Sequence, residues 1–183
     1  MSDFYIEDCD CNSDESQECE RHFKCVCDTR QKKIKANRTK LRCGNSGSLV
    51  LPANTIAGTS FTLTTVSVNA KDLRKPCINL EFTSNISNMD SGLTLDFQIF
   101  KQCNGRTTPI PIGPVWVFSR PSGILNSNTF SFFVCDCDIC DDECCVYSVV
   151  ARVASIVTGV TLINHASLSA FIVDNDCNAC KSR

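Results

Sequence analysis

The stretch Leu93-Thr94-Leu95-Asp96-Phe97-Gln98-Ile99 alternates large apolar residues with polar ones. Successive side chains of a β-strand point to opposite faces, so this alternation predicts a strand with one face against a core and the other in solvent. A similar alternation, with a break in its register, runs through Phe61–Val68. The fold is therefore expected to consist of half-buried strands.

Eight segments of this kind follow one another, each rich in β-branched or aromatic residues and bounded by turn residues. No helix-length periodic segment lies between them, which argues against an α/β fold. The sequence predicts an all-β protein, an antiparallel β-sandwich with about eight strands that is most simply a jelly roll. The expected strands are Ser48–Leu51, Thr59–Val68, Cys77–Ile86, Leu93–Cys103, Val115–Ser119, Thr129–Cys137, Cys145–Ser155 and Val160–Val173.

An open sandwich has edge strands, and a strand of another chain can add to such an edge. The segments Val149–Val157 and Val160–Val173 contain few charged residues, with Arg152 alone before Asp174. We therefore expect one such edge to be covered by a neighbouring subunit.

Charge divides the chain into parts. Residues 1–20 carry eight acidic groups and no basic ones, whereas residues 21–42 carry nine basic groups against Asp28 alone. Few large apolar residues occur there, so this segment would not bury a core of its own. We predict an extended, cysteine-rich N-terminal connector arm at 1–42, the β-sandwich at 43–176 and a cysteine-containing C-terminal tail at 177–183.

Several classes of partner and activity are not expected. The basic run Gln31–Arg42 lacks interleaved aromatic residues, so nucleic-acid binding is not predicted. No apolar segment approaches the ~20 residues that span a bilayer, so no membrane partner is expected. His22 and His165 are the only histidines, and there is no phosphate-binding glycine loop or serine nucleophile elbow, so the protein is not expected to be an enzyme.

Cysteine is the unusual component, with 15 residues, an odd number. At least one thiol must be free, bound to metal or joined to another molecule. Cysteines at strand ends, namely Cys43, Cys77 and Cys103, are candidates for disulfides within the sandwich. In Cys144-Cys145 the two side chains of a strand would point to opposite faces. The candidates for disulfides between subunits are Cys9, Cys11, Cys19, Cys25, Cys27, Cys135, Cys137, Cys140, Cys144, Cys145, Cys177 and Cys180.

Structural zinc is the alternative use of these thiols. The pairs Cys137/Cys140 and Cys177/Cys180 could supply four thiolates to one ion, in a soluble zinc-binding module. The pairs lack the glycine-rich knuckle of zinc ribbons, and zinc would not explain the C-x-C pairs in the arm. Cross-linking through sulfur is favoured and no cofactor is expected, but the metal interpretation stays open.

The start Met1-Ser2-Asp3-Phe4 lacks a basic segment followed by an apolar run, so synthesis without a signal peptide is expected. Thiols stay reduced in a cytosol, whereas this cysteine content suits oxidising surroundings. Either the thiols hold metal inside the cell, or the protein meets oxidant later by a route other than secretion.

Several strings resemble a clostridial cysteine-rich family of unassigned function. They are Leu41-Arg42-Cys43-Gly44, Lys75–Ile86, Phe97–Cys103, Gly113-Pro114-Val115-Trp116 and Phe130–Cys137. By architecture this family is similar to the endospore-appendage (Ena-type) pilin subunits. Those are jelly-roll subunits with a flexible N-terminal connector, stacked by β-sheet augmentation and locked by disulfides between subunits.

The resemblance implies a structural subunit of a self-assembling, disulfide-cross-linked fibre or surface layer. Its partners would be copies of itself in a helical homopolymer, together with other spore-surface proteins. The expected location is the endospore surface, extracellular after the mother cell lyses. This route would explain how a chain made in the cytosol is later exposed to oxidant.

Overall fold

The computed structural model describes residues 39–71, 73, 75–88, 92–104, 107–122, 126–138 and 144–174. In this part of the chain no helix is long and apolar enough to cross a membrane. The described residues form nine β-strands: β1 (Thr39–Cys43), β2 (Gly47–Leu51), β3 (Ser60–Asn69), β4 (Pro76–Asn88), β5 (Leu93–Cys103), β6 (Ile110–Arg120), β7 (Asn126–Asp136), β8 (Cys144–Val153) and β9 (Thr161–Asp174).

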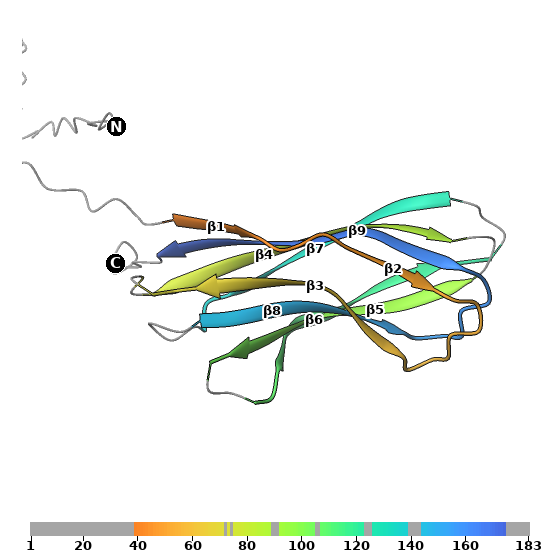
Figure 1. Ribbon diagram of the computed structural model, residues 1–183, viewed down its shortest axis with the longest axis horizontal. Helices are drawn as coiled ribbons and strands as arrows, with labels where there is room; N and C mark the ends of the chain where they lie inside the picture. The colour runs from red at the N-terminus through yellow and green to blue at the C-terminus, as the bar shows by residue number, and fades with distance from the viewer. Residues whose placement is uncertain are drawn as a thin grey trace, which may run out of the picture. The chain divides into compact units, whose positions relative to one another are not determined.

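The strands form two antiparallel sheets, stacked as the upper and lower layers in Figure 1. Sheet A has the order β1-β9-β4-β7, and β2 also pairs with β9; sheet B has the order β3-β8-β5-β6. Because β1 and β2 pair with successive parts of β9, they take the place of one interrupted strand. Two four-stranded layers with this order form a jelly roll, so the predicted fold class is confirmed.

The core lies between the sheets and is filled by alternate residues of the central strands. Along β4 and β5 the buried positions alternate with more exposed ones, as the sequence pattern predicts. The ring centroids of Phe82 in sheet A and Phe97 in sheet B lie 5.8 Å apart, and Phe132 of β7 lies 5.1 Å from Phe82. The contact between Phe82 and Phe97 joins the two layers, and Phe132 extends the aromatic cluster along sheet A.

The expectation about the edges is wrong in its choice of strands. Strand β8 lies between β3 and β5, and β9 lies between β4 and the pair β1/β2. Their low charge is compatible with this central position, because each strand pairs with neighbours on both sides and buries one face in the core. In the described part of the chain, the edges are β1/β2 and β7 in sheet A, and β3 and β6 in sheet B.

Strand β6 starts earlier than expected, at Ile110, and includes Pro111 and Pro114. The sequence predicted a strand only over Val115–Ser119. Proline removes one donor from a strand ladder, and an edge strand tolerates that loss on its outward side.

The boundary of the connector arm also moves. Strand β1 begins at Thr39, so the last four residues of the predicted arm, 39–42, belong to the sandwich. The alternation of apolar residues did not reveal β1 because the strand lies at an edge and four of its five residues are exposed. Residues 1–38 lie outside the described residues.

Two glycines, one directly after β1 and one at the start of β2, let the chain pass close to β3. A Cβ atom on Gly44 would overlap the carbonyl oxygen of Thr65, and one on Gly47 would overlap that of Leu63. Gly44 N–H also donates to Leu168 O at 2.8 Å. The interrupted strand of sheet A therefore closes one side of the sandwich against the edge of sheet B.

The substitution Gly44→Ala should lower the free energy of unfolding by about 1–3 kcal/mol, because the methyl group meets backbone that cannot move independently. Gly92→Ala is the matched control, since its Cβ would meet nothing closer than 3.7 Å. Urea unfolding of both variants measures the effect. Equal stability of the two variants would contradict the close approach at Gly44.

Candidate functional site

Seven cysteines lie among the described residues, and four of them form disulfides within the chain. The bonds are Cys77–Cys137 and Cys103–Cys145. The other three, Cys43, Cys135 and Cys144, form no disulfide in the described part of the chain. The structure therefore divides the thiols of the sandwich into paired and unpaired groups.

The buried disulfide joins two neighbouring strands of sheet B. Cys103 of β5 is directly opposite Cys145 of β8 in the antiparallel register. Directly opposite residues have Cβ atoms about 5 Å apart, which suits a disulfide. Both cysteines face the core, with exposures of 5% and 1%.

The second disulfide lies on the outer face of sheet A. Cys77 is the second residue of β4, and Cys137 directly follows the last residue of β7. The ladder pairs Ile78 with Asp136, so the next position along each strand brings Cys77 and Cys137 together. Cys137 is exposed and Cys77 is half-buried.

These bonds change three assignments. Cys137 and Cys145 were candidates for disulfides between subunits, but each pairs within the chain; Cys43 was a candidate for pairing within the sandwich, but it forms no disulfide there. The reason in each case is strand register, which composition does not supply. Cys77 and Cys103 do pair within the sandwich. The predicted opposite orientation of Cys144 and Cys145 is confirmed, since Cys145 is buried and Cys144 is half-exposed.

The unpaired thiols Cys43 and Cys135 lie on the same outer face of sheet A. One row across the sheet contains Leu41, Phe171, Asn79 and Cys135, and the next contains Cys43, Ser169, Glu81 and Phe133. The neighbouring residues Ile78 and Leu80 are buried in the core, so these two rows face outward.

Three large apolar side chains are exposed to solvent on this outer face. Phe133 is 70% exposed, Leu41 63% and Phe171 46%. The nearest partner of the Cys135 thiol is the side-chain oxygen of Asn79, with Sγ and Oδ1 3.8 Å apart. We call Leu41, Cys43, Phe133, Cys135 and Phe171 the outer patch.

Cys43 and Cys135 cannot bond to each other within the folded sandwich. They lie on β1 and β7, at opposite edges of sheet A, with β9 and β4 between them. Three strand spacings put their Cα atoms about 14 Å or more apart. A disulfide requires Cα atoms within about 7 Å.

Cys144, the third unpaired thiol, faces a different part of the surface. It lines a shallow hollow of about 270 Å³ together with Arg42, Asn69 and Asn104. Arg42 comes from the edge of sheet A, and the others come from sheet B and the turn after β5. The outer patch does not include this thiol.

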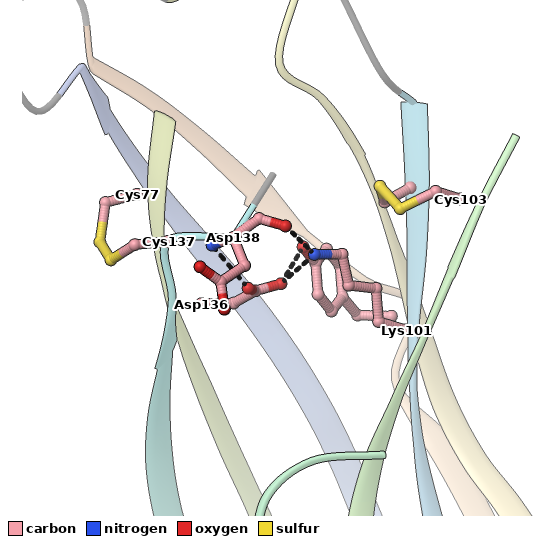
Figure 2. A network of polar contacts seen from close by, with 8 residues as sticks. Cys77, Lys101, Cys103, Asp136, Cys137 and Asp138 are labelled. Atoms are coloured by element: carbon pink, nitrogen blue, oxygen red, sulfur yellow. Dashed lines mark hydrogen bonds and ion pairs between the residues drawn. A yellow bond between two sulfur atoms is a disulfide. The ribbon is translucent and has the colours of Figure 1, made fainter. Parts of the chain in front are cut away.

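A buried ion pair joins the two sheets between the disulfides, as Figure 2 shows. Lys101 Nζ of β5 lies 2.9 Å from Asp136 Oδ2 of β7, and both side chains are 6% exposed. Tyr147 of β8 donates its hydroxyl to the same carboxylate oxygen at 2.8 Å. Asp136 Oδ1 accepts the N–H of Asp138 at 3.1 Å, and Lys101 Nζ donates to Asp138 O at 2.7 Å.

This network fixes the segment that carries the exposed cysteines. Asp136 stands between Cys135 and Cys137, and its inward side chain holds both neighbours on the outer face. The signal that could have found the pair is Lys101, which occupies an inward position in the alternation Leu93, Leu95, Phe97, Ile99, Lys101.

The zinc hypothesis loses one of its four ligands in this structure. Cys137 is bonded to Cys77, and a disulfide sulfur is not the thiolate that zinc binds. Among the described residues, no group of three or more cysteine, histidine or acidic side chains could hold a metal ion.

The remaining cysteine candidates lie outside the described residues. They are Cys9, Cys11, Cys19, Cys25, Cys27, Cys140, Cys177 and Cys180. Of the two histidines, His165 is exposed on β9 at a position with φ of 53°, where the pairing with β4 shifts register. His22 is also outside the described part.

A family model described as a domain of unknown function (DUF4489) matches residues 37–173. That range contains both disulfides and all nine strands except the last residue of β9, Asp174. The chain belongs to the DUF4489 family. No curated protein matches it.

The fold of this DUF4489 chain is similar to part of one solved structure at low sequence identity. The structure of infectious bursal disease virus, Gt strain, aligns with a TM-score of 0.50 and 12% identity over 78% of this chain and 34% of the viral chain. The DUF4489 chain thus spans about a third of the viral chain. Eiger TNF from S. frugiperda aligns with a TM-score of 0.44 and 8% identity over 79% of this chain and 98% of its own.

Removing one partner of the buried ion pair should destabilise the DUF4489 sandwich strongly. Asp136→Ala leaves Lys101 charged and buried, so the free energy of unfolding should fall by about 3–5 kcal/mol. The double variant Lys101→Met, Asp136→Leu should lose much less, because neither position then buries an unpaired charge. Denaturant unfolding of the oxidised protein measures both.

Glu81→Ala is the control for loss of a carboxylate, because Glu81 is exposed on the outer face. Its effect should stay within about 0.5 kcal/mol. If Asp136→Ala behaved like Glu81→Ala, the ion pair would not hold the two sheets together.

Proposed function

We propose that this protein is a structural subunit that assembles with copies of itself into a disulfide-cross-linked fibre or surface layer. The outer patch is the observation that carries the proposal. It combines two unpaired thiols with three exposed large apolar side chains on one face of a rigid sheet. Exposed apolar surface of this kind favours contact with another protein.

The geometry of the thiols favours a bond to another chain. Cys43 and Cys135 are too far apart to pair with each other, and β-sheet backbone holds both in place. The two disulfides within the sandwich fit a protein that functions in oxidised form. A second copy would bring its own unpaired cysteines to this face, where they could form disulfides with Cys43 or Cys135.

Strand β7 offers a second means of assembly. It is an edge strand of eleven residues without proline, lysine or arginine. Natural edge strands are commonly protected by such residues, and β6, the neighbouring edge of sheet B, carries two prolines. An added strand from another copy would pair along β7 and bring that chain close to Cys135.

Disulfides between copies would give the assembly its persistence. Separation of the subunits would then require reduction of a covalent bond, and dilution alone would not achieve it. An endospore surface is the proposed location, on the resemblance to endospore-appendage pilins. Lysis of the mother cell would expose the thiols to oxidant after the chain has been made and folded.

An isotope-mixing experiment tests the bond between copies. Natural-abundance and heavy-nitrogen chains are mixed in equal amounts while reduced, then oxidised by air and digested without reduction. Because an inter-chain bond joins labels at random, half of the disulfide peptides that contain Cys43 or Cys135 should carry one light and one heavy partner. Mass spectrometry of the peptides gives this fraction.

The Cys103–Cys145 peptide is the internal control and should contain like labels only, since that bond forms within one chain. The double variant Cys43→Ser, Cys135→Ser should stay folded, because both residues are exposed. It should also form fewer covalent multimers than the parent chain, because the two thiols of the outer patch are gone. If Cys43 and Cys135 remained free thiols or formed only like-labelled bonds, the proposed function would be rejected.

A further inference from the structure

The two disulfides differ in their access to solvent, although each joins neighbouring antiparallel strands. Cys103–Cys145 faces the core and is covered by both sheets. Cys77–Cys137 lies on the outer face of sheet A, where Cys137 is exposed and Cys77 is half-buried. Figure 2 shows the two bonds on either side of the Lys101–Asp136 pair. A thiolate must reach a sulfur atom to attack a disulfide, so only the outer bond is open to attack in the folded protein.

A free thiol accompanies the exposed bond. Cys135 is two residues before Cys137 on the same face, and it is opposite Asn79, the position after Ile78 on β4. Cys135 is therefore a diagonal neighbour of Cys77, and such residues lie about 7–8 Å apart, with their Cβ atoms somewhat closer. One exposed disulfide and one free thiol thus form a compact sulfur cluster at the end of the β4–β7 edge.

Opening of the exposed bond would not release the strands that it joins. Strands β4 and β7 are paired from Ile78↔Asp136 to Asn88↔Asn126. Asp136, directly before Cys137, is also held by Lys101 and Tyr147. The backbone around the cysteines therefore stays in place when the sulfur bond changes partner.

We propose that Cys77–Cys137 is an exchangeable disulfide that accepts a thiolate from a second copy of the chain, whereas Cys103–Cys145 is a permanent structural bond. The second copy as the source of the thiolate rests on the proposed function. The chemistry of the site itself does not, because any accessible thiolate can react there.

The exchange is balanced without an external oxidant. The incoming thiolate attacks the sulfur of Cys137, the more exposed of the two, and forms a new S–S bond to it. The Cys77–Cys137 bond breaks, its electron pair leaves with the Cys77 sulfur, and that thiolate takes a proton from solvent. One disulfide and one thiol are present before and after the step. Copies could therefore become linked wherever one chain is oxidised and its neighbour still holds a free thiol.

Glutathione is the probe for this site, applied to the full oxidised chain without denaturant. Samples are quenched with acid, the free thiols are alkylated, and mass spectrometry maps every cysteine peptide. Glutathione should appear on Cys137 or Cys77 at least tenfold faster than on Cys103 or Cys145. Equal rates at the two bonds, faster opening of Cys103–Cys145, or reaction only after denaturant is added would overturn the proposal.

Two variants test which cysteines take up glutathione and where the attacking thiolate comes from. Cys77→Ser, Cys137→Ser should remain folded, because the β4–β7 ladder is intact, and should lose glutathione uptake at this site. Cys135→Ser should keep uptake within about twofold, since the attacking thiolate comes from outside. If Cys135→Ser abolished uptake, the resident thiol would be the attacking group and the proposal would be wrong.

The outcome is separable from that of the proposed function. Uptake of glutathione at Cys137 without mixed-label peptides would support the exchange site and reject assembly between copies. Mixed-label peptides at Cys43 and Cys135 without glutathione uptake would support assembly between copies and reject the exchange site.

Discussion

The burial of one face of each sheet is the constraint on which the rest of this structure depends. Side chains alternate between the core and the outer faces along β4, β5 and β9, so each residue's place in the alternation decides whether it is enclosed or accessible. The same rule sorts the cysteines. Cys103 and Cys145 fall on inward positions and form a protected bond, whereas Cys77, Cys135 and Cys137 fall on outward positions. The chemistry available to each sulfur follows from this placement.

The Lys101–Asp136 pair fixes the inward and outward directions of the side chains at this end of the sandwich. A carboxylate and an ammonium group out of water are stable only when paired and hydrogen-bonded, and here Tyr147 and the backbone of Asp138 complete the network. Because Asp136 lies between Cys135 and Cys137, the network sets the direction of both sulfur-bearing residues. Cysteines held in fixed positions suit the proposed role. In that role a subunit contacts its neighbours in a defined geometry and then forms disulfides with them.

The sequence predicted the fold well and the sulfur pairing poorly, for one physical reason. Alternation and turn residues are local properties of the chain, and they were enough to predict the sandwich and most of its strands. Register and strand order are not local. The low charge of β8 and β9 suggested edges, yet both are central. The strand expected at Val115–Ser119 begins at Ile110, because an edge strand tolerates the prolines that precede Val115. Cys103 meets Cys145 only because β5 and β8 are neighbours in a particular register. Lys101 carried a signal in its inward position, but its partner depended on the packing of one sheet on the other.

Electron microscopy of the air-oxidised full chain, before and after transfer to denaturant without reductant, tests the central claim most directly. The account predicts extended fibres or sheets whose subunits stay joined in denaturant and separate on reduction, because disulfides link the copies. Single particles of one chain, or assemblies that denaturant alone disperses, would contradict it.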